Sequence, residues 1–551
     1  MSDPASDDVG RPAKRGLSTG HGGSLQDPQA PFRPHDDSLT PDPASGQRRG
    51  RAVMVLGTTS GAGKSFLTTA LCRWYARQGL RVAPYKAQNM SNNARVVPGL
   101  DGRQGEIGSA QYFQALAARA RPEVRMNPVL LKPEKDTASQ VVVLGDVDAA
   151  LSRAPWRERS ETLWTRARGA LHALLAENDV VVIEGAGSPA EINLHSSDYV
   201  NMRTAREADA ACLLVTDIDR GGAFAHLYGT HALLPPDERA LIRGFVLNRF
   251  RGDAALLSPG PEMLQQMTGV PTLATLPMWR GHGLPEEDGV FDDRTTGGLG
   301  TDDGTGGGTR APVRVAVIAY PRLSNLDEFQ PLRNLPGVRL SWARTPAELD
   351  GVDWIILPGS KAVAADLAWL RAQRLDVAVA AHAAAGGRVL GICGGLQMLG
   401  EALVDPHGLD GNAPGLGLLP LVTLFEREKL LREAECRFAP TLDAPWSSLN
   451  GQVARGYEIH HGRTAQHPGL PAARPVLFDG LGEPVGWQHG PVLGHYLHGL
   501  FEDDRVLAAL FDRPARPLDQ VFDELADYVD RHFAPGVLMG LLSPSATRAS
   551  P

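Results

Sequence analysis

The stretch VMVLGTTSGAGKSFLTTALCRWY, Val53 to Tyr75, decides the fold of the first half of this chain. An apolar, β-branched run is followed by a glycine-rich turn, and then by residues with helical spacing. Such a turn directs backbone N–H groups and the positive end of a helix at an anion. The pattern therefore predicts a phosphate-binding loop in which Gly61, Gly63, Lys64 and Ser65 contact a nucleotide, with ATP and Mg²⁺ as the expected ligands.

The loop departs from the strict spacing GxxxxGK[ST]. That pattern requires a glycine at position 58, where the chain has Thr58, and Gly57 lies one residue too early. The alternative interpretation is a glycine-rich turn that only joins a strand to a helix. The strand before the loop and the helix after it favour phosphate binding, with Lys64 on the terminal phosphates and Ser65 on the magnesium ion.

Acidic and amide side chains follow the next apolar runs. Glu184 ends VVVIE, Asp217 and Asp219 end LLVTDID, and Asn248 lies in LNRFRGD. The carboxyl ends of parallel strands meet at one edge of a sheet, where α/β proteins bind ligands. We therefore expect Ser65, Glu184 and Asp217 to hold the metal and Asn248 to contact the nucleotide. The alternative is that these side chains only cap helices or turns.

The rhythm of the whole chain predicts an α/β protein with two domains. Short β-branched runs alternate with amphipathic ones, which is typical of a parallel sheet with helices on both faces. Two stretches rich in Gly, Pro, Ser and Asp interrupt this rhythm. We predict a disordered tail at 1–50, an ATP-binding domain at 51–284, a flexible linker at 285–311 and a second α/β domain at 312–551.

The composition points to small-molecule partners. The chain has 551 residues, of which 42% are hydrophobic, and a formal net charge of −8, so nothing favours binding to nucleic acid or to an anionic membrane. No apolar run approaches the roughly 20 residues of a membrane span. The four cysteines are far apart and show no CxxC spacing, which argues against zinc and disulfides. We expect a cytoplasmic protein.

A glycine-flanked cysteine marks the second domain. In GRVLGICGGLQMLG, Cys393 lies between an apolar strand and a helix. The glycines allow a tight elbow, and the helix start favours the thiolate. Gly394, together with Gly359 in the upstream ILPGSK, is expected to supply N–H groups to an oxyanion hole. The alternative is a small core residue.

A thiolate nucleophile needs a base, and several histidines are available. GHYLHGLFED contains His495 and His498 after an apolar strand, and GYEIHHGRT contains His460 and His461 beside Glu458. We favour His498 as the base. The residues alone leave this choice open.

Two polar stretches are not explained by nucleotide or thiol chemistry. KAQNMSNN includes Lys86, Asn89 and Asn92, and NPVLLKPEKD includes Lys132. Burying so many amides is unfavourable unless a polar partner satisfies them. These stretches therefore predict a ligand rich in carboxylates or amides, and the alternative is a pair of solvated loops.

Taken together, these motifs resemble those of the cobyric acid synthases, a family of glutamine-hydrolysing enzymes of the cobalamin pathway. The resemblance runs from about residue 52 to 533, and the order of its motifs is more specific than any one of them. The motifs are GTTSGAGKS, KAQNMSNN, NPVLLKP, IEGAGSPAEINL, TDIDRGG, NRFRGD, LPGSK, GICGGLQMLG, GYEIHHGRT and YLHGLF.

The resemblance implies the following fold and activity. The first domain is similar to dethiobiotin synthetase and the second to class I glutamine amidotransferases. The family amidates the b, d, e and g carboxylates of adenosylcobyrinic acid a,c-diamide with ATP and glutamine, with Cys393 as nucleophile and His498 as base. The polar stretches would then bind the corrinoid. A homo-oligomer is left open.

Departures and alternatives remain. Many class I amidotransferases have a carboxylate two residues after the base, where this chain has Leu500, so the third member of the triad is undetermined, with Glu458 and Glu502 as guesses. The rival function is a cobyrinic acid a,c-diamide synthase, which the KAQNMSNN stretch disfavours. A different class is a regulatory ATPase resembling partition proteins, which carry a lysine where this chain has Thr59.

Overall fold

The computed structural model describes residues 50–135, 138–285, 311–513 and 516–543, and all of these lie within one compact unit. The predicted tail and linker fall outside the described residues, apart from the residues at their edges. The predicted division at 284 and 312 remains a prediction.

A six-stranded parallel sheet forms the first half. Its strand order is β12-β11-β10-β1-β9-β2, and every neighbouring pair is parallel. The strands are β1 (Arg51–Gly57), β2 (Val82–Tyr85), β9 (Val180–Glu184), β10 (Ala211–Asp217), β11 (Ile242–Phe250) and β12 (Thr272–Pro277). The predicted parallel α/β sheet is therefore confirmed, and the loops after β1, β9, β10 and β11 meet at one edge.

Alternation along β1 shows why this sheet is covered on both faces. Val53 and Val55 belong to the core that contains helix α1, and Met54 and Leu56 belong to the core that contains α4. All four are fully buried, as expected for a central strand whose side chains alternate between two covered faces. The helices of this half are α1 (Lys64–Arg77), α2 (Ser109–Ala117), α3 (Ala149–Arg153), α4 (Trp156–Glu177), α5 (Thr204–Ala208), α6 (Ala223–Leu233), α7 (Pro236–Arg239) and α8 (Gly260–Thr268), with short turns η2 (Val124–Met126), η3 (Tyr199–Arg203) and η4 (Ala254–Leu257).

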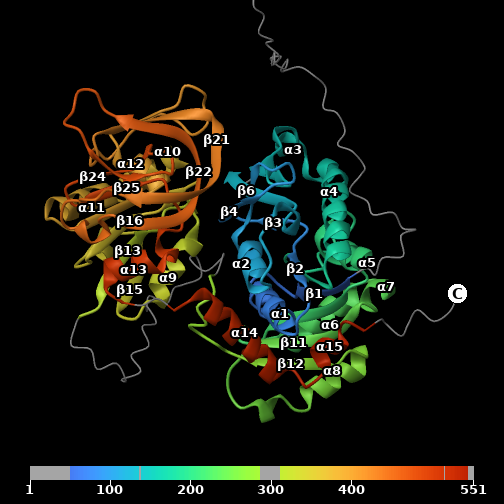
Figure 1. Ribbon diagram of the computed structural model, residues 1–551. Helices are drawn as coiled ribbons and strands as arrows, with labels where there is room; N and C mark the ends of the chain where they lie inside the picture. Colours follow the sequence, from blue (N-terminus) through green and yellow to red (C-terminus); the bar gives the residue numbers. More distant parts are fainter. Residues whose placement is uncertain (1–49, 136–137, 286–310, 514–515, 544–551) are drawn as a thin grey trace, which may run out of the picture. The chain divides into compact units, whose positions relative to one another are not determined.

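The C-terminal helices pack on this first sheet. The helix expected near residues 517–533 is present as α14 (Leu518–His532), followed by α15 (Val537–Gly540). Figure 1 shows α14, in red, beside α1, in blue. Trp74 Nε1 donates to Asp530 Oδ1 at 2.8 Å, and Tyr75 OH donates to Leu538 O at 2.7 Å. The end of the predicted second domain thus completes the core of the first sheet.

Short strands surround the two polar stretches. Residues of KAQNMSNN form β3 (Asn89–Met90) and lead into β4 (Ala94–Pro98), which pairs with β5 (Gln104–Gly108). Residues 129–135 of NPVLLKPEKD form β6 (Val129–Lys135), which pairs with β3 and β7 (Ala138–Val143), and β8 (Asp146–Val147) completes this small sheet. The polar stretches are therefore structured, not solvated loops.

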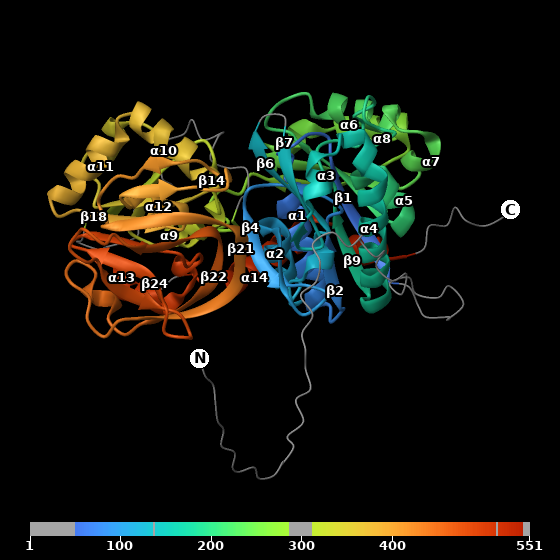
Figure 2. The same ribbon diagram turned by 90° about the horizontal axis from the view of Figure 1, so that it is seen from above.

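An eleven-stranded mixed sheet forms the second half. The predicted strands are present within a parallel part made of β13 (Val313–Ile318), β15 (Val338–Ala343), β16 (Trp354–Leu357), β18 (Arg388–Ile392) and β25 (Val492–His495). The remaining strands are β19 (Ala402–Val404), β20 (Ala413–Pro414), β21 (Leu421–Phe438), β22 (Val453–Gln466), β23 (Arg474–Phe478) and β24 (Pro484–His489). Figure 2 shows β21 and β22 as a long antiparallel ribbon, which the sequence patterns did not predict.

Short elements join these strands. Strands β14 (Leu323–Ser324) and β17 (Gly359–Ser360) pair with each other. The helices and turns are η5 (Leu326–Phe329), α9 (Gln330–Asn334), η6 (Pro346–Leu349), α10 (Val363–Ala372), α11 (Leu375–Ala384), α12 (Gly394–Leu399), η7 (Ser447–Leu449), η8 (Leu500–Glu502) and α13 (Asp504–Phe511). Across the described ranges, no helix combines the length and the apolar character that crossing a membrane requires.

Candidate active sites

The loop between β1 and α1 closes around the ammonium group of Lys64. Gly57 lies so near this group that a Cβ at position 57 would be 2.9 Å from Lys64 Nζ. Lys64 Nζ donates hydrogen bonds to Thr59 O at 3.0 Å and to Gly187 O at 3.1 Å. The side chain is only 8% exposed, so its charge is held inside the turn. The variant spacing with Thr58 therefore still produces a loop folded around the lysine.

Glu184, at the end of β9, is buried and has three side-chain partners. Its Oε1 accepts from Ser65 Oγ at 3.0 Å and from Lys86 Nζ at 2.8 Å, and its Oε2 accepts from Gln114 Nε2 at 2.5 Å. Burial acts to raise the pKa of Glu184, but the Lys86 ammonium and the hydrogen bonds from Lys86 and Gln114 hold it below its usual value. The structure thus brings a charged carboxylate to Ser65.

Asp217, the other predicted metal ligand, has different neighbours. It is buried at the end of β10, and its Oδ2 pairs with Arg249 Nη1 at 3.0 Å and with Arg220 Nε at 3.4 Å. Among the described residues, no three His, Cys, Asp or Glu side chains are grouped so that they could hold a metal ion by themselves. Of the three predicted metal ligands, Ser65 and Glu184 are in contact with each other, and Asp217 is paired with arginines.

Asn248, at the end of β11, contacts the phosphate loop itself. Its Nδ2 donates to Ala62 O at 2.9 Å. A Cβ at Gly63 would lie 2.0 Å from this nitrogen, and Gly63 has a φ of +96°, so both the space and the backbone require glycine. Asn248 thus holds the phosphate loop through Ala62, and its predicted contact with the nucleotide remains a prediction.

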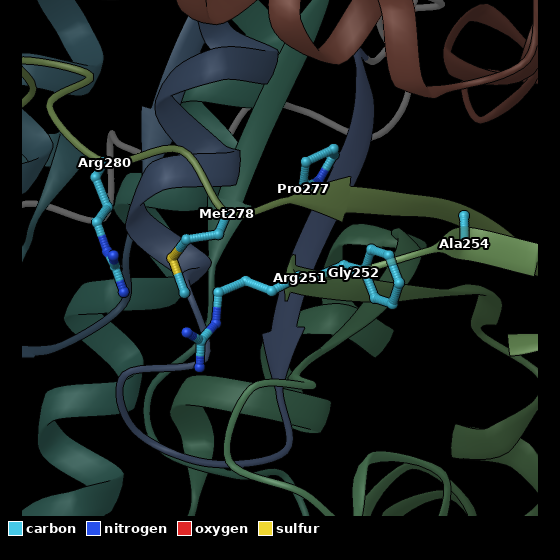
Figure 3. A pocket seen from close by; sticks show the side chains of 7 residues that line it. Arg251, Gly252, Ala254, Pro277, Met278 and Arg280 are labelled. Atoms are coloured by element: carbon cyan, nitrogen blue, oxygen red, sulfur yellow. The ribbon is translucent and has the colours of Figure 1, made fainter. Parts of the chain in front are cut away.

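A hollow of about 550 Å³ opens beside the ends of β11 and β12 (Figure 3). The side chains of Arg251, Met278 and Arg280 extend toward the same side of it. Its surface is largely apolar, and of its two arginines Arg251 pairs with Asp219. The residues that line the hollow are Phe250, Arg251, Gly252, Ala254, Pro277, Met278 and Arg280.

Cys393 stands at a strained elbow between β18 and α12. Its φ of 53° and ψ of −107° are rare for a residue with a side chain, and such strain is typical of nucleophile elbows. Neighbouring chain segments pass very closely: a Cβ at Gly395 would lie 1.9 Å from Leu357 O, and one at Gly394 would lie 2.8 Å from Ser360 N. The two loops predicted to supply N–H groups therefore meet beside the thiol.

His498, after β25, lies between a carboxylate and the thiol. Its Nδ1 is 3.1 Å from Glu328 Oε1, and Gly499 N donates to Glu328 Oε2 at 3.2 Å. The Tyr457 ring stacks on the imidazole with centroids 5.2 Å apart. Burial acts to lower the pKa of His498, but Glu328 and Cys393 raise it to about 10. The imidazole is therefore protonated at neutral pH.

The other histidines have different surroundings. Burial lowers the pKa of His495 to about 3, and burial together with Lys429 lowers that of His461 to about 4. His460 stacks on Tyr496 with centroids 3.8 Å apart. The contacts thus single out His498 as the partner of Cys393.

Neither carboxylate guessed for the triad lies at His498 Nδ1. Glu458 accepts from Arg432 Nε at 2.9 Å and faces His460 Nε2 at 3.3 Å. Glu502 pairs with Arg95 at 2.5 Å. Both side chains are thus paired elsewhere.

The KAQNMSNN stretch is largely buried and includes an unsatisfied polar atom. Lys86 and Asn89 are 7% and 4% exposed. Asn92 Oδ1, both amide atoms of Gln111 and Gln114 Oε1 are buried without a hydrogen-bond partner among the described residues. Each such atom costs about 1–3 kcal/mol unless something satisfies it. These atoms are therefore candidates for contact with a ligand rich in polar groups.

Lys132 has a different environment. It is 3% exposed and pairs with Glu106, which also accepts from Lys429 Nζ at 2.7 Å. The structure thus places Lys132 in a buried ion cluster with Glu106 and Lys429.

Two family models match the chain in the order of its two sheets. The CobQ/CobB/MinD/ParA nucleotide binding domain matches residues 53–281, and the CobB/CobQ-like glutamine amidotransferase domain matches residues 314–506. The first includes the phosphate loop, and the second includes Cys393 and His498. Nucleotide binding and glutamine amidotransfer thus belong to separate parts of the chain.

Curated relatives match almost the whole chain. "Cobyric acid synthase" of Methylibium petroleiphilum is 70% identical over 498 residues, covering 90% of this chain and 97% of that protein. The protein of the same name from Leptothrix cholodnii is 68% identical over 512 residues, with the same two coverages, 90% and 97%. The chain belongs to the cobyric acid synthase family. Among solved structures, PurLQS from Thermotoga maritima is a weak match, with a TM-score of 0.28 and 18% identity over 37% of this chain and 99% of that chain.

Membership of the cobyric acid synthase family decides the enzyme class. The chain is a glutamine-hydrolysing amidoligase of cobalamin biosynthesis that acts on small molecules and uses a nucleotide. The amidotransferase match argues against the regulatory ATPase. The name of the two relatives favours cobyric acid synthase over the a,c-diamide synthase.

Glu328 is the site residue that the sequence patterns missed in this cobyric acid synthase family member. It lies in SNLDEF, a short segment after β13 with an acid pair among apolar residues. Glu328 is fully buried, and charged side chains are rarely buried without a partner. An acid pair in an apolar segment was the available signal, but it did not reveal which histidine Glu328 contacts.

Proposed function

We propose that this chain converts the b, d, e and g carboxylates of adenosylcobyrinic acid a,c-diamide into amides, with ATP as the energy source and glutamine as the nitrogen donor. The main support is that one chain of this family holds a buried Cys393–His498–Glu328 array and a phosphate loop whose Ser65 contacts Glu184. The cysteine array suits the hydrolysis of an amide, and the phosphate loop suits the activation of a carboxylate for conversion into an amide.

The phosphate loop would activate the corrinoid carboxylate. A carboxylate resists nucleophiles because of its charge and resonance, and transfer of a phosphoryl group turns it into an acyl phosphate, a mixed anhydride from which phosphate leaves when ammonia attacks. Lys64 would bind the terminal phosphates, while Ser65 and Glu184 would hold Mg²⁺, with Asp217 as a further candidate ligand. When bound, Mg²⁺ would neutralise charge on the transferred phosphoryl group.

The loop and the hollow also suit the rest of the nucleotide. Gly61 and Gly63 belong to the turn, and Asn248 ties that turn to β11 through Ala62 O. The hollow at the end of β11 would receive the base.

The second array would release ammonia from glutamine. The Cys393 thiolate would attack the amide carbon, and His498 would give its proton to the departing ammonia. Backbone N–H groups near Gly359 and Gly394 would stabilise the oxyanion. Water, deprotonated by His498, would then cleave the thioester to give glutamate and regenerate the thiolate.

The buried amide cluster would bind the corrinoid beside the activated carboxylate. Asn89 and Asn92 would contact its amide and carboxylate groups, and Lys86 lies next to them on Glu184. Lys132 is paired with Glu106, so in this proposal it supports the wall of the site.

The deciding experiment separates the two nitrogen sources. Cys393→Ala should abolish amidation with glutamine but retain it with ammonium chloride at a pH where free ammonia is plentiful, because the synthetase reaction needs only the nitrogen nucleophile. Products are counted by mass as amides added to the corrinoid. Cys436→Ala is the matched control, since Cys436 is also a buried free thiol of the second half. A Cys393→Ala variant that is inactive with ammonia would contradict the proposal.

The cysteines bear on where the enzyme is located. All four cysteines are free and buried. We propose a cytoplasmic location, where thiols stay reduced.

A further inference from the structure

The segment that carries Glu328 is held by Asn93 and by residues of β4, all in the nucleotide-binding half of the chain. We call Asn325–Phe329 the Glu328 segment. Asn325 Nδ2 donates to Ala94 O at 2.8 Å, and Leu326 N donates to Asn93 Oδ1 at 3.0 Å. These bonds fix both the side chain and the backbone at the start of the segment.

Arg95 forms hydrogen bonds to the middle of the Glu328 segment. Its Nε donates to Asp327 Oδ2 at 2.8 Å, while Ser109 Oγ donates to Asp327 Oδ1 at 3.0 Å. Its two terminal nitrogens donate to Glu502 at 2.5 and 3.0 Å. Both oxygens of Asp327 are therefore held by residues of the first half. The next residue along the chain is Glu328.

The Arg95 guanidinium also lies against aromatic rings. Its central carbon is 4.9 Å from the Phe113 ring centroid, 5.2 Å from that of Tyr112 and 5.0 Å from that of Tyr457. Tyr457 in turn stacks on His498, and its OH accepts from Asn325 Nδ2 at 2.6 Å. Arg95 thus reaches the imidazole by two routes, one through Asp327 and Glu328 and one through Tyr457.

The physical effect of this arrangement is to fix the geometry of a buried acid. Arg95 is 1% exposed and Asp327 is 2% exposed, so each needs the other as a charge partner. A planar guanidinium can bond two carboxylates and stack on rings at the same time, which a lysine cannot do. Without that cation, the Asp327 charge would repel the adjacent Glu328 carboxylate and displace it from His498 Nδ1.

We propose that Arg95 is a positioning residue for glutamine hydrolysis, acting from the nucleotide-binding half through Asp327 and Tyr457 on Glu328 and His498. This inference rests on the glutaminase part of the proposed function. Only Ala94 separates Arg95 from the end of KAQNMSNN in the sequence. The stretch proposed to bind the corrinoid is thus continuous with the strand that holds the glutaminase base.

The test compares variants of the full chain in glutamate release from glutamine. Arg95→Met removes the charge but retains length and apolar contact, and it should lower kcat about 10- to 100-fold, because a small displacement of a reacting group has effects of that size. The KM for glutamine should change by less than about threefold, since glutamine itself does not touch Arg95. Arg95→Lys restores the positive charge but not the planar guanidinium that bonds two carboxylates. Its kcat should therefore lie between those of the wild type and Arg95→Met.

Arg73→Met is the matched control for loss of a buried arginine. Arg73 is fully buried, pairs with Asp519 and lies 5.4 Å from the Phe522 ring centroid, all within the core of the first sheet. It should lower the melting temperature without lowering the kcat for glutamate release. Equal loss of kcat in both variants would overturn the inference, as would an unchanged kcat in Arg95→Met.

Asp327→Asn covers the case in which Arg95→Met does not fold. The amide retains the shape of Asp327: its oxygen can still accept from Arg95, and its nitrogen can donate to Ser109 Oγ. It lacks the charge, so kcat should fall several-fold and the KM for glutamine should stay unchanged. An unchanged kcat in Asp327→Asn would also overturn the inference. A wild-type chain that releases no glutamate at all would instead refute the proposed function.

Discussion

Glu328→Gln tests the assignment of the carboxylate in the glutaminase site. Glutamine retains a carbonyl oxygen that can accept a hydrogen bond from His498 Nδ1, so the orientation of the ring is largely preserved. The substitution removes the negative charge beside the imidazole. It also places an amide group opposite the N–H of Gly499, which donates to Glu328 Oε2 in the wild type.

The size of the effect follows from the distance between the two groups. Unit charges 3.1 Å apart attract by about 5 kcal/mol at an effective dielectric constant of about 20. At about 1.4 kcal/mol per unit, this corresponds to roughly 3 to 4 pKa units. That is comparable to the rise of the His498 pKa from 6.5 to about 10. The pKa of His498 should therefore fall markedly in Glu328→Gln.

The kcat for glutamate release should fall together with the pKa of His498. His498 must carry its proton until ammonia leaves, and Glu328 stabilises that charged state. Cys393 and the remaining hydrogen bond still favour the imidazolium, so only part of the attraction is lost. We expect kcat for glutamate release to fall about 100- to 1,000-fold, equivalent to about 3 to 4 kcal/mol. Amidation with added ammonia should be unchanged.

Stability should also change with pH in a defined direction. The folded pKa of His498, about 10, lies above its ordinary value of 6.5. Its contribution to the free energy of unfolding is therefore complete below about pH 6.5 and is lost as the pH rises through 10. Urea denaturation across this range should show a smaller alkaline loss in Glu328→Gln than in the wild type.

The assay is glutamate release by the purified full chain, with Glu458→Gln as the control. Glu458 is equally buried in the same half but pairs with Arg432 and His460. Its variant should retain kcat within a few-fold. If Glu328→Gln retained most of the wild-type kcat, or if Glu458→Gln lost as much, the assignment of Glu328 would be wrong.

Two further predictions concern the first half. Lys64→Ala should lose amidation with either nitrogen source, because the cation over the transferred phosphate is gone. Glutamate release by Cys393 should persist. Near-normal ATP turnover with corrinoid present would contradict the phosphate-loop assignment. Replacing Asn89 and Asn92 together by alanine should raise the corrinoid KM about tenfold, since each lost amide contact is worth about 0.5–1.5 kcal/mol, and partly amidated products should accumulate in mass spectra with the KM for ATP unchanged. Full amidation at an unchanged corrinoid KM would place the substrate elsewhere.

Local patterns predicted the elements on which both sites are built. Strand β1, its glycine turn and α1 are consecutive in the chain, as are β18, Cys393 and α12. Their geometry is set by neighbouring residues, because an apolar run, a glycine with positive φ and a helical pattern each restrict the backbone locally. The loops after parallel strands also follow from the fold class. This is why Lys64, Ser65 and Glu184 could be named before their contacts were known.

Contacts between distant segments were beyond the reach of these patterns. Helix α14 was expected as a terminal helix, but nothing in its apolar spacing indicates that it packs on α1 rather than on the second sheet. The β21–β22 ribbon has charged residues among its apolar ones, so it lacks the continuous runs that marked the buried strands. The same holds for Lys132, whose partner Glu106 lies 26 residues away on another strand.

The triad acid shows this limit most clearly. A His-x-Glu pattern places base and acid on the same segment, so their contact is written into one short motif. Here Leu500 occupies that position, and the acid comes from a residue 170 positions earlier. The backbone around Glu328 is in turn fixed by Asn93 and Arg95, more than 230 positions from the segment they hold. Because the acid does not lie on the same segment as His498, the orientation of this base depends on packing in the nucleotide-binding half.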